Sequence, residues 1–197
     1  MCEVQSRPLV LGILGSPREK SNTGLLLRHV LAGAEAAGAE TRMVSLRELT
    51  YRSCRHCGGC ERTGECVVRD DMTELYRSIG AAQHLVLASP IQFSGVSGET
   101  KAMIDRAQAL WMAKYRLSLP VTKVVGPQRG VFVATCGGSD TRLFAWAAHP
   151  VKAFFLAAGF AYWGELFAAS TDNPPAVPER RDLLVRARTL GKELVSN

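Results

Sequence analysis

The sequence predicts a single α/β domain with a parallel sheet and helices on both faces. Short apolar segments typical of buried strands alternate along the chain with longer segments of helical periodicity. The 197 residues suit one domain, and a composition of 47% hydrophobic and 21% charged residues is that of a globular protein. Because no internal repeat, linker or low-complexity tract interrupts the alternation, we expect residues 1–197 to form one domain.

Five segments rich in apolar and β-branched residues predict the strands, at residues 9–14, 41–46, 84–89, 131–135 and 160–166. Between them, apolar residues recur at helical spacing, most clearly at Leu26, Val30 and Ala34. Helices are expected at residues 23–37, 98–112, 143–158 and 178–195, and one more opens at residue 70 or 71. Since ligands of such sheets bind beyond the carboxyl ends of the strands, the loops after the first, third and fourth strands are the expected binding loops.

The ends of several elements carry residues that start or stop regular structure. Pro90 is expected to end the third strand. Asp70 or Asp71 can cap the helix that follows, and Glu74, three residues after Asp71, resembles a capping box. Pro150 lies inside a helical pattern and is expected to break or kink that helix.

Charge and hydropathy exclude some classes of protein. No apolar run reaches the roughly 20 residues of a membrane span, and the first residues lack the order of a signal peptide, so we expect a cytoplasmic protein without membrane contact. The net charge is +6, but its cations are scattered, which argues against nucleic acid as a partner. Four arginines do gather around the cysteines, as a solvated surface or as charge balance for an anionic centre or acidic partner. They are Arg52, Arg55, Arg62 and Arg69.

The loop after the first strand predicts a phosphate site. It reads GSPREKSNT from residue 15 to residue 23 and runs directly into a helix, whose free amides and dipole favour an anion. The hydroxyl and amide groups of residues 16, 21, 22 and 23 can donate to phosphate oxygens, and Arg18 adds a charged donor. Neither a Walker sequence nor the dinucleotide fingerprint is present, and a plain polar turn with a helix cap is the alternative.

Four of the six cysteines fall within 13 residues, a crowding that favours metal binding over disulfides. They are Cys54, Cys57, Cys60 and Cys66, with the spacing C-x2-C-x2-C-x5-C. Structural zinc usually takes two C-x-x-C pairs separated by a longer span, whereas three cysteines at consecutive three-residue steps suit the separate iron corners of a cluster. Zinc and a loop that has lost its metal remain the alternatives.

Three stretches of the chain together resemble one known family. They are Gly15 to Arg18 followed by Ser21-Asn22-Thr23, the stretch SPIQFSGVSG from Ser89 to Gly98, and KAMIDR from Lys101 to Arg106. In this order they resemble the NADPH-dependent FMN reductase family, which is flavodoxin-like. The resemblance implies a doubly wound five-stranded parallel sheet in the order 2-1-3-4-5, with residues 47–70 as a cysteine-rich insertion after strand 2.

The resemblance also implies where FMN binds. Its phosphate is expected in the first loop, its ring against the backbone of residues 90–94, and a third loop completes the ring site. The implied cofactor-binding residues are Ser16, Arg18, Ser21, Asn22, Thr23, Pro90, Ile91, Gln92, Phe93, Ser94, Thr135, Cys136, Gly137 and Gly138. Family members often carry an aromatic residue two positions after the proline. This chain has Gln92 there and Phe93 next, which leaves open how the ring is stacked.

The cysteine spacing, followed by Asp70-Asp71-Met72, resembles the iron–sulfur flavoprotein branch of this family. In that branch four cysteines ligate a [4Fe–4S] cluster beside FMN, which implies the four closely spaced cysteines as ligands here. The expected function is an oxidoreductase that passes electrons between a [4Fe–4S] cluster, FMN and a small-molecule substrate, with ferredoxin as a candidate electron carrier. The resemblance also implies a homodimer or homotetramer.

Several other functions stay open. A dehydrogenase of a small carboxylated substrate, similar to the aminodeoxychorismate dehydrogenases of secondary metabolism, would use cations such as Arg142, His149 and Lys152. A plain NAD(P)H-dependent FMN or quinone reductase would need no cluster, and a flavin-binding redox sensor would show no turnover. Asp105 and Arg106 are interpreted as a structural or interface ion pair.

Overall fold

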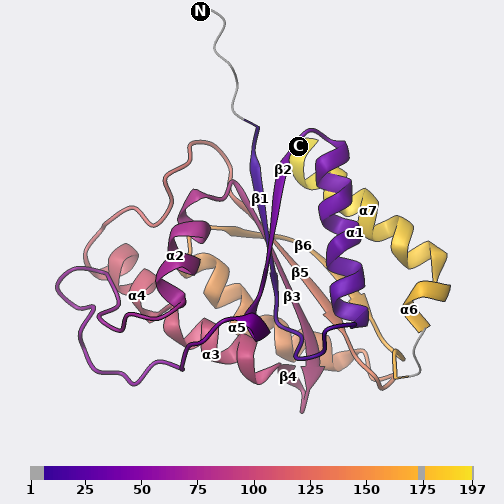
Figure 1. The fold of residues 1–197 in the computed structure, drawn as a ribbon, viewed down its shortest axis with the longest axis horizontal. Helices are drawn as coiled ribbons and strands as arrows, with labels where there is room; N and C mark the ends of the chain where they lie inside the picture. Colours follow the sequence, from indigo (N-terminus) through magenta and orange to yellow (C-terminus); the bar gives the residue numbers. More distant parts are fainter. Residues whose placement is uncertain (1–6, 173–175, 197) are drawn as a thin grey trace, which may run out of the picture.

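The computed structural model describes residues 7–172 and 176–196, which form a three-layer α/β fold with a central parallel sheet (Figure 1). The parallel strands are β1 (Leu9–Leu14), β2 (Glu40–Ser45), β3 (His84–Gln92), β5 (Arg129–Thr135) and β6 (Ala161–Ala168). They lie in the order β2-β1-β3-β5-β6, and a short strand β4 (Gly95–Val96) pairs antiparallel with the end of β3. Without β4, this is the order 2-1-3-4-5, so the predicted flavodoxin-like fold is confirmed.

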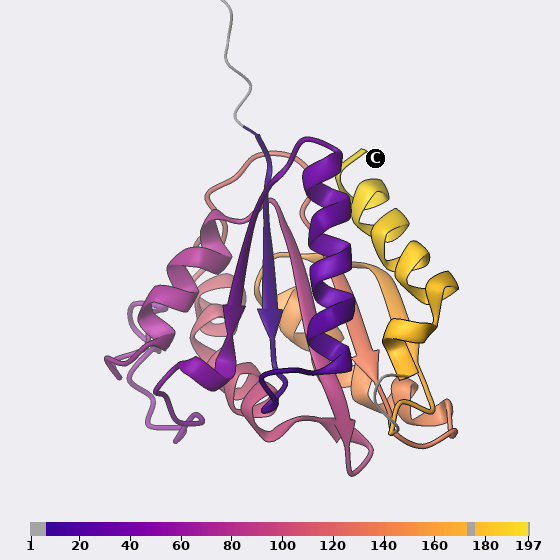
Figure 2. The ribbon, with the colours of Figure 1, turned by 45° about the vertical axis from the view of Figure 1, so that its right-hand side comes forward.

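Two helical layers cover the sheet. On one face lie α1 (Asn22–Ala36), α6 (Ala176–Glu179) and α7 (Arg181–Ser196). On the other lie α2 (Met72–Ala81), α3 (Gly98–Arg106), α4 (Gln108–Trp111) and α5 (Arg142–Ala157), with the short turns η1 (Leu46–Glu48) and η2 (Met112–Arg116) (Figures 1 and 2). In the described part of the chain, no helix is both long enough and apolar enough to cross a membrane.

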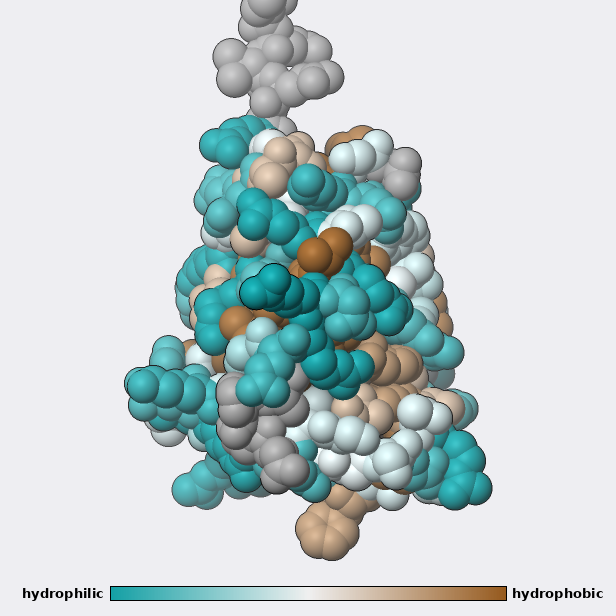
Figure 3. All heavy atoms as spheres, turned by 90° about the vertical axis from the view of Figure 1, so that its right-hand side faces the viewer, coloured by the Kyte–Doolittle hydropathy of each residue, from teal (hydrophilic) through white to brown (hydrophobic). Residues whose placement is uncertain are grey.

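The central strands divide the hydrophobic core into two halves. In β1, Leu11 and Ile13 pack with the helices of the α2–α5 layer, whereas Val10 and Leu14 pack with α1 and α7, as the two-residue period of a strand requires. All four side chains are buried, because a parallel sheet covered on both faces has no solvent face. The outer surface over α1 and α7 is largely hydrophilic (Figure 3).

The predicted end of the third strand is wrong, because β3 continues through Pro90 to Gln92. Pro90 lies opposite Thr135 in the ladder with β5, and a proline at the end of a ladder loses only one donor. Beyond it, Ile91 and Gln92 pair with Val96 and Gly95. The antiparallel return strand therefore extends β3 past the parallel sheet.

Two helix predictions also need correction. The segment expected as one helix at 98–112 is divided into α3, α4 and the π-helical turn η2, because Ala107 has a ψ of 0° and its amide bonds to the carbonyl of Ile104, three residues back instead of four. The segment expected at 178–195 forms α6 and α7. A break at Pro150 is also ruled out, because α5 is continuous from Arg142 to Ala157 with Pro150 inside it.

The capping box expected before α2 is absent, because Asp71 makes no side-chain hydrogen bond to the helix. Its Oδ2 instead accepts a hydrogen bond from the amide of Thr50 at 2.6 Å. Asp70 Oδ1 accepts from the amide of Met72 at 3.1 Å, and Glu74 pairs with Arg77. Asp71 thus ties the start of α2 to the beginning of the cysteine-containing segment.

Candidate cofactor sites

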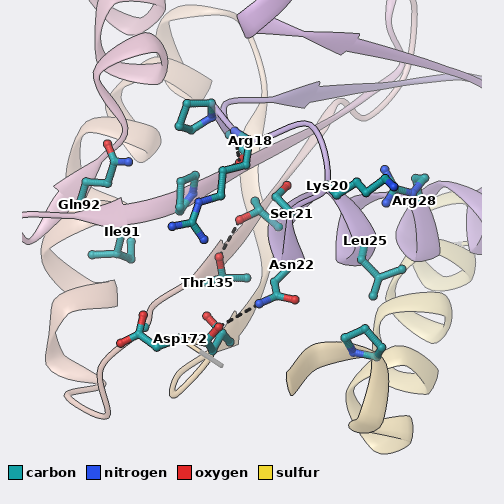
Figure 4. A pocket seen from close by; sticks show the side chains of 17 residues that line it. Arg18, Lys20, Ser21, Asn22, Leu25, Arg28, Ile91, Gln92, Thr135 and Asp172 are labelled. Carbon is teal, nitrogen blue, oxygen red and sulfur yellow. Dashed lines mark hydrogen bonds between the residues drawn. The ribbon is translucent and has the colours of Figure 1, made fainter. Parts of the chain in front are cut away.

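A cavity of about 430 Å³ opens beyond the carboxyl ends of β1, β3, β5 and β6 (Figure 4). It contains most of the residues expected to bind FMN, from all three expected loops. These are Ser16, Arg18, Ser21, Asn22, Thr23, Pro90, Ile91, Gln92, Thr135 and Gly137. The other expected residues, Phe93, Ser94, Cys136 and Gly138, are not part of its lining. We call this space the flavin cavity below.

The first loop and the start of α1 form a polar, cationic side of the flavin cavity. Ser21 caps α1, since its Oγ accepts a hydrogen bond from the amide of Gly24 at 3.0 Å. Ser16 Oγ accepts from the amide of Arg18 at 3.3 Å, and the Arg18 side chain extends across the middle of the cavity (Figure 4). Lys20 also lines this side. Free amides at a helix start beside cations are suited to bind a phosphate.

A buried network of hydroxyl groups fixes this loop against α3. Ser97 Oγ donates to the carbonyl of Gly15 at 2.5 Å and accepts from the amide of Thr100 at 3.2 Å, which makes it the cap of α3. The amide of Ser97 donates to Ser89 Oγ at 3.0 Å. Ser89, Ser97 and Thr100 are fully buried, so the ends of β1 and β3 and the start of α3 are held together inside the protein.

The tip of the β3–β4 hairpin has a strained backbone. Phe93 and Ser94 both have positive φ values, 46° and 65°, as the two central residues of a type I′ turn require. Glycine and asparagine usually occupy such positions, because a side chain makes them costly. The Phe93 side chain is fully exposed, so it points away from the core while Pro90, Ile91 and Gln92 line the cavity.

The loop after β6 contributes to the flavin cavity and was not among the expected loops. The amide of Thr171 donates to the carbonyl of Cys136 at 3.0 Å, and the carbonyl of Thr171 accepts from Asn22 Nδ2 at 3.0 Å. Asp172 lies directly on Gly137, where any Cβ would clash with the Asp172 carboxylate. The sequence does carry a signal for this loop. Thr171 and Asp172 are polar residues that follow soon after β6, whose carboxyl end lies at the same edge of the sheet as the other binding loops.

Cys136 and two threonines connect the strand ends at this edge of the sheet. The Cys136 side chain is buried in the core. Its amide donates to the carbonyl of Ala168 at 2.8 Å, which joins the end of β5 to the end of β6. Thr23 Oγ1 and Thr135 Oγ1 are 2.6 Å apart and connect the first loop with the third. The lining residues that the sequence did not single out are Pro17, Lys20, Leu25, Arg28, Thr171, Asp172 and Pro178.

The four closely spaced cysteines surround a second, smaller cavity of about 70 Å³. All four line it, in a segment that has no regular helix or strand between η1 and α2. Burial raises the pKa of the Cys60 thiol, and the proximity of the other three thiols raises it further. The structure thus gathers the four sulfurs that the sequence predicted as ligands around one space, which we call the cysteine cavity.

The donor set of the cysteine cavity fits an iron–sulfur cluster. Such clusters are held by four cysteine thiolates. Soft sulfur donors favour iron–sulfur clusters, zinc and Cu(I) over harder metal ions. Gly58, which lines the cavity, and Gly64, between the last two cysteines, have positive φ values of 71° and 73°, so the segment turns at two points where a side chain would strain the backbone. Among the described residues, no three cysteine, histidine or acidic side chains are arranged to hold a single metal ion.

Arg106 anchors the cysteine-containing segment. Its guanidinium pairs with Asp70 at 2.6 Å and lies 3.4 Å from Cys66 Sγ. Burial alone would lower the pKa of Arg106, but the hydrogen bonds to Asp70 raise it. The expected ion pair between Asp105 and Arg106 is therefore wrong. Arg106 pairs with Asp70, and Asp105 pairs with Lys101 at 2.6 Å.

The three cations considered for a carboxylated substrate lie outside the flavin cavity. Arg142 pairs with Asp140 at 2.8 Å, and His149 Nδ1 lies 2.8 Å from the carbonyl oxygen of Ala145 on the same helix. Lys152 Nζ lies 4.7 Å from the centre of the Tyr162 ring. All three cations are exposed on α5, so the geometry gives no support to their role in substrate binding.

Comparison with known proteins identifies the family of this chain. The sequence profile of the NADPH-dependent FMN reductase family matches residues 8–169. An iron–sulfur flavoprotein of Methanocaldococcus jannaschii is 34% identical over 134 residues, which cover 68% of this chain and 67% of the relative. Two iron–sulfur flavoproteins of Archaeoglobus fulgidus are 39% and 35% identical over 54% and 72% of this chain. Those two matches span 54% and 64% of the relatives' own length.

Solved structures share the fold at lower identity. An NAD(P)H:quinone oxidoreductase from Methanothermobacter marburgensis superposes with a TM-score of 0.69 at 18% identity and covers 98% of this chain and 99% of its own. An FMN-dependent NADH-azoreductase from Bacillus anthracis, solved with FMN, gives a TM-score of 0.65 at 14% identity, covering 96% and 100%. The profile match and the identities above show that the chain belongs to the NADPH-dependent FMN reductase family of FMN-dependent oxidoreductases, in its iron–sulfur flavoprotein branch.

Proposed function

We propose that this chain binds FMN in the flavin cavity, holds a [4Fe–4S] cluster in the cysteine cavity, and moves electrons between these groups and a small-molecule substrate. FMN exchanges electrons singly or in pairs and a cluster exchanges them singly, so together they convert between one-electron and two-electron reactions. The observation that carries the proposal is that four thiols line one cavity in a protein of this family.

The residues of the flavin cavity have separate tasks in this proposal. The amides at the start of α1 and the side chains of Ser16 and Arg18 hold the phosphate, since both the helix dipole and the cation favour an anion there. Pro90, Ile91 and Gln92 border the space for the ring on one side and Thr135 on the other (Figure 4).

The four thiols of the cysteine cavity would ligate iron as thiolates, which concentrates negative charge in that segment. Arg106 provides a buried positive charge beside them. The exposed Arg52, Arg55, Arg62 and Arg69 lie in the same segment and suit an acidic electron-carrier protein, of which ferredoxin is the candidate. Trp111 and Trp146 are exposed at 40% and 55% on α4 and α5, and we assign them to an interface of a homodimer or homotetramer.

A plain NAD(P)H-dependent FMN or quinone reductase is the second candidate. It is favoured by one observation, that the flavin cavity and the cysteine cavity share no lining residue. The flavin cavity is therefore complete without any group bound to the cysteines. In this case the cysteine segment would not take part in the reaction.

One anaerobic preparation tests both candidates. We expect about four iron and four sulfide per chain, a yellow-brown protein, and FMN released on denaturation. Rapid mixing with reduced ferredoxin should then bleach the cluster absorbance before the flavin absorbance. Full flavin reduction by NADPH in a preparation that contains no iron or sulfide would support the plain reductase instead.

A further inference from the structure

Arg106 is a buried cation with more contacts than a structural ion pair needs. It is the last residue of α3, and only 3% of its surface is exposed. Arg106 lines the cysteine cavity and also a second cavity, which shares Cys54 and Cys66 with it. We propose that Arg106 is a positioning residue for the cluster: it closes the cysteine segment before the cluster binds and raises the reduction potential of the bound cluster. This inference rests on the proposed function.

The guanidinium joins the two ends of the segment that carries the cysteines. Nη1 donates to the carbonyl of Arg52 at 3.0 Å, just before the first cysteine. Nη2 lies 3.5 Å from the carbonyl of Val68, just after the last cysteine, and both nitrogens donate to Asp70 at 2.6 and 3.1 Å. Because none of these contacts involves a thiol, they can form in the protein without a cluster.

The same group also contacts a predicted ligand. Nη2 lies 3.4 Å from Cys66 Sγ, within hydrogen-bond distance for sulfur. An N–H donor stabilises a thiolate more strongly as charge on the cluster increases, so it favours the reduced state. Hydrogen bonds to cluster sulfurs are a general determinant of cluster potential.

One donor of Arg106 has no acceptor among the described residues. Its Nε is buried and makes no hydrogen bond, although Asp70, Arg52 and Val68 occupy the other two nitrogens. A buried unpaired donor is costly and indicates an acceptor that binds at the site. The sulfides of a cluster are such acceptors, and the adjacent cavity is lined by four thiols.

The test compares two substitutions of Arg106 with a matched control. Arg106→Lys keeps the positive charge but loses the planar guanidinium with its two Nη donors and its Nε. Arg106→Met removes the charge as well. Arg77→Lys is the control, because Arg77 is exposed and its ion pair among the described residues is an i,i+3 contact with Glu74. Each variant is prepared anaerobically, its iron, sulfide and FMN are counted, and the cluster potential is measured by an EPR-monitored redox titration.

We expect Arg106→Met to retain several-fold less iron than the parent chain with an unchanged FMN content. We expect Arg106→Lys to load the cluster and to shift its reduction equilibrium about tenfold toward the oxidised state, ~59 mV for one electron. Arg77→Lys should match the parent chain in both measurements. Trypsin should also cut the cysteine segment of iron-free Arg106→Met faster than that of the iron-free parent chain.

Two outcomes separate this inference from the function on which it rests. A parent chain that takes up no iron or sulfide overturns the proposed function, and this inference with it. A parent chain with a cluster, together with an Arg106→Lys variant that titrates at the parent potential and an Arg106→Met variant that loads fully, overturns the role of Arg106 alone.

Discussion

The flavin cavity and the cysteine cavity are built in different ways. The flavin cavity lies at the carboxyl ends of four parallel strands, and buried hydroxyl pairs such as Thr23 with Thr135 connect its loops. The cysteine cavity is lined largely by an irregular segment between η1 and α2, which runs outside the sheet (Figure 1). Besides the Asp71 contact, that segment is anchored by Arg106 and by Tyr51, whose hydroxyl donates to the carbonyl of Glu99 at 2.7 Å.

This difference indicates how each site forms. The topology of the sheet brings the flavin loops together, so the flavin cavity exists as soon as the domain folds. The cysteine segment has few apolar contacts of its own, and its ordering depends on side-chain anchors and on whatever the thiols bind. Because the cavities share no lining residue, each can be damaged without the other.

The largest expected effect is the loss of the cluster on Cys60→Ser. Cys60 is half-buried in the cysteine cavity, and a serine hydroxyl is a poor ligand for iron. We expect iron and sulfide to fall at least several-fold while FMN content stays at the parent level. Cys136→Ala is the matched control, because Cys136 is a buried thiol outside the cysteine cavity, and its iron content should not change. Loss of FMN together with iron in Cys60→Ser would show that the two regions are coupled.

The reverse experiment is Gly15→Ala, which should damage the flavin site alone. A Cβ on Gly15 would overlap Thr100 Oγ1, inside the hydroxyl network that holds the first loop. Relief of this clash costs about 1–3 kcal/mol and displaces the loop. We expect FMN affinity, measured by fluorescence quenching, to fall at least about tenfold with normal iron content. Gly98→Ala, whose Cβ would meet nothing within 4 Å, should bind FMN normally.

The sequence predicted the parts of the molecule that depend on local patterns. The strands and the first helix follow from apolar periodicity. Helix α1 begins at Asn22, one residue before the expected start, because the side chain of Ser21 caps it by accepting from the amide of Gly24. The ligand-binding edge follows from the order of strands and helices. The loop of residues 15–23 therefore lines the cavity as expected.

The missed features depend on contacts between distant parts of the chain. Asp172 enters the flavin cavity because β6 ends beside β5, where it lies on Gly137. Arg106 pairs with Asp70 rather than with its neighbour Asp105, because α3 turns Arg106 toward the buried side. Sequence periodicity assigns a residue to a face, but it does not identify the partner on another element.

If the chain unfolds as one cooperative domain, acid should abolish FMN binding and cluster binding over the same pH range. His84 is buried at the start of β3, and burial, helped by the nearby Arg129, lowers its pKa to about 4 from an ordinary value of 6.5. The fold therefore favours neutral His84. Its contribution is complete above about pH 6.5 and is lost as the pH falls toward 4, up to about 3 kcal/mol.

We expect the free energy of unfolding in urea to fall over this pH range, and the fall to be smaller in His84→Leu. His149→Leu, at an exposed histidine, should keep the full pH dependence. Loss of cluster absorbance at a higher pH than loss of FMN would show instead that the cysteine segment unfolds separately.

The smallest expected effect concerns the second anchor of the cysteine segment. Tyr51→Phe removes the hydrogen bond to the carbonyl of Glu99 but keeps the ring in the core. Burial, helped by the Glu99 carboxylate, raises the pKa of Tyr51 to about 12, so the hydroxyl is a donor at every pH of interest. The loss should cost about 1 kcal/mol in urea unfolding. It should also speed iron release to a chelator while FMN affinity stays unchanged. Tyr115→Phe is the control, because Tyr115 is exposed and its hydroxyl makes only a weak 3.4 Å contact; it should change neither the unfolding free energy nor the rate of iron release. Equal iron release from Tyr51→Phe and Tyr115→Phe would show that Tyr51 does not anchor the cysteine segment.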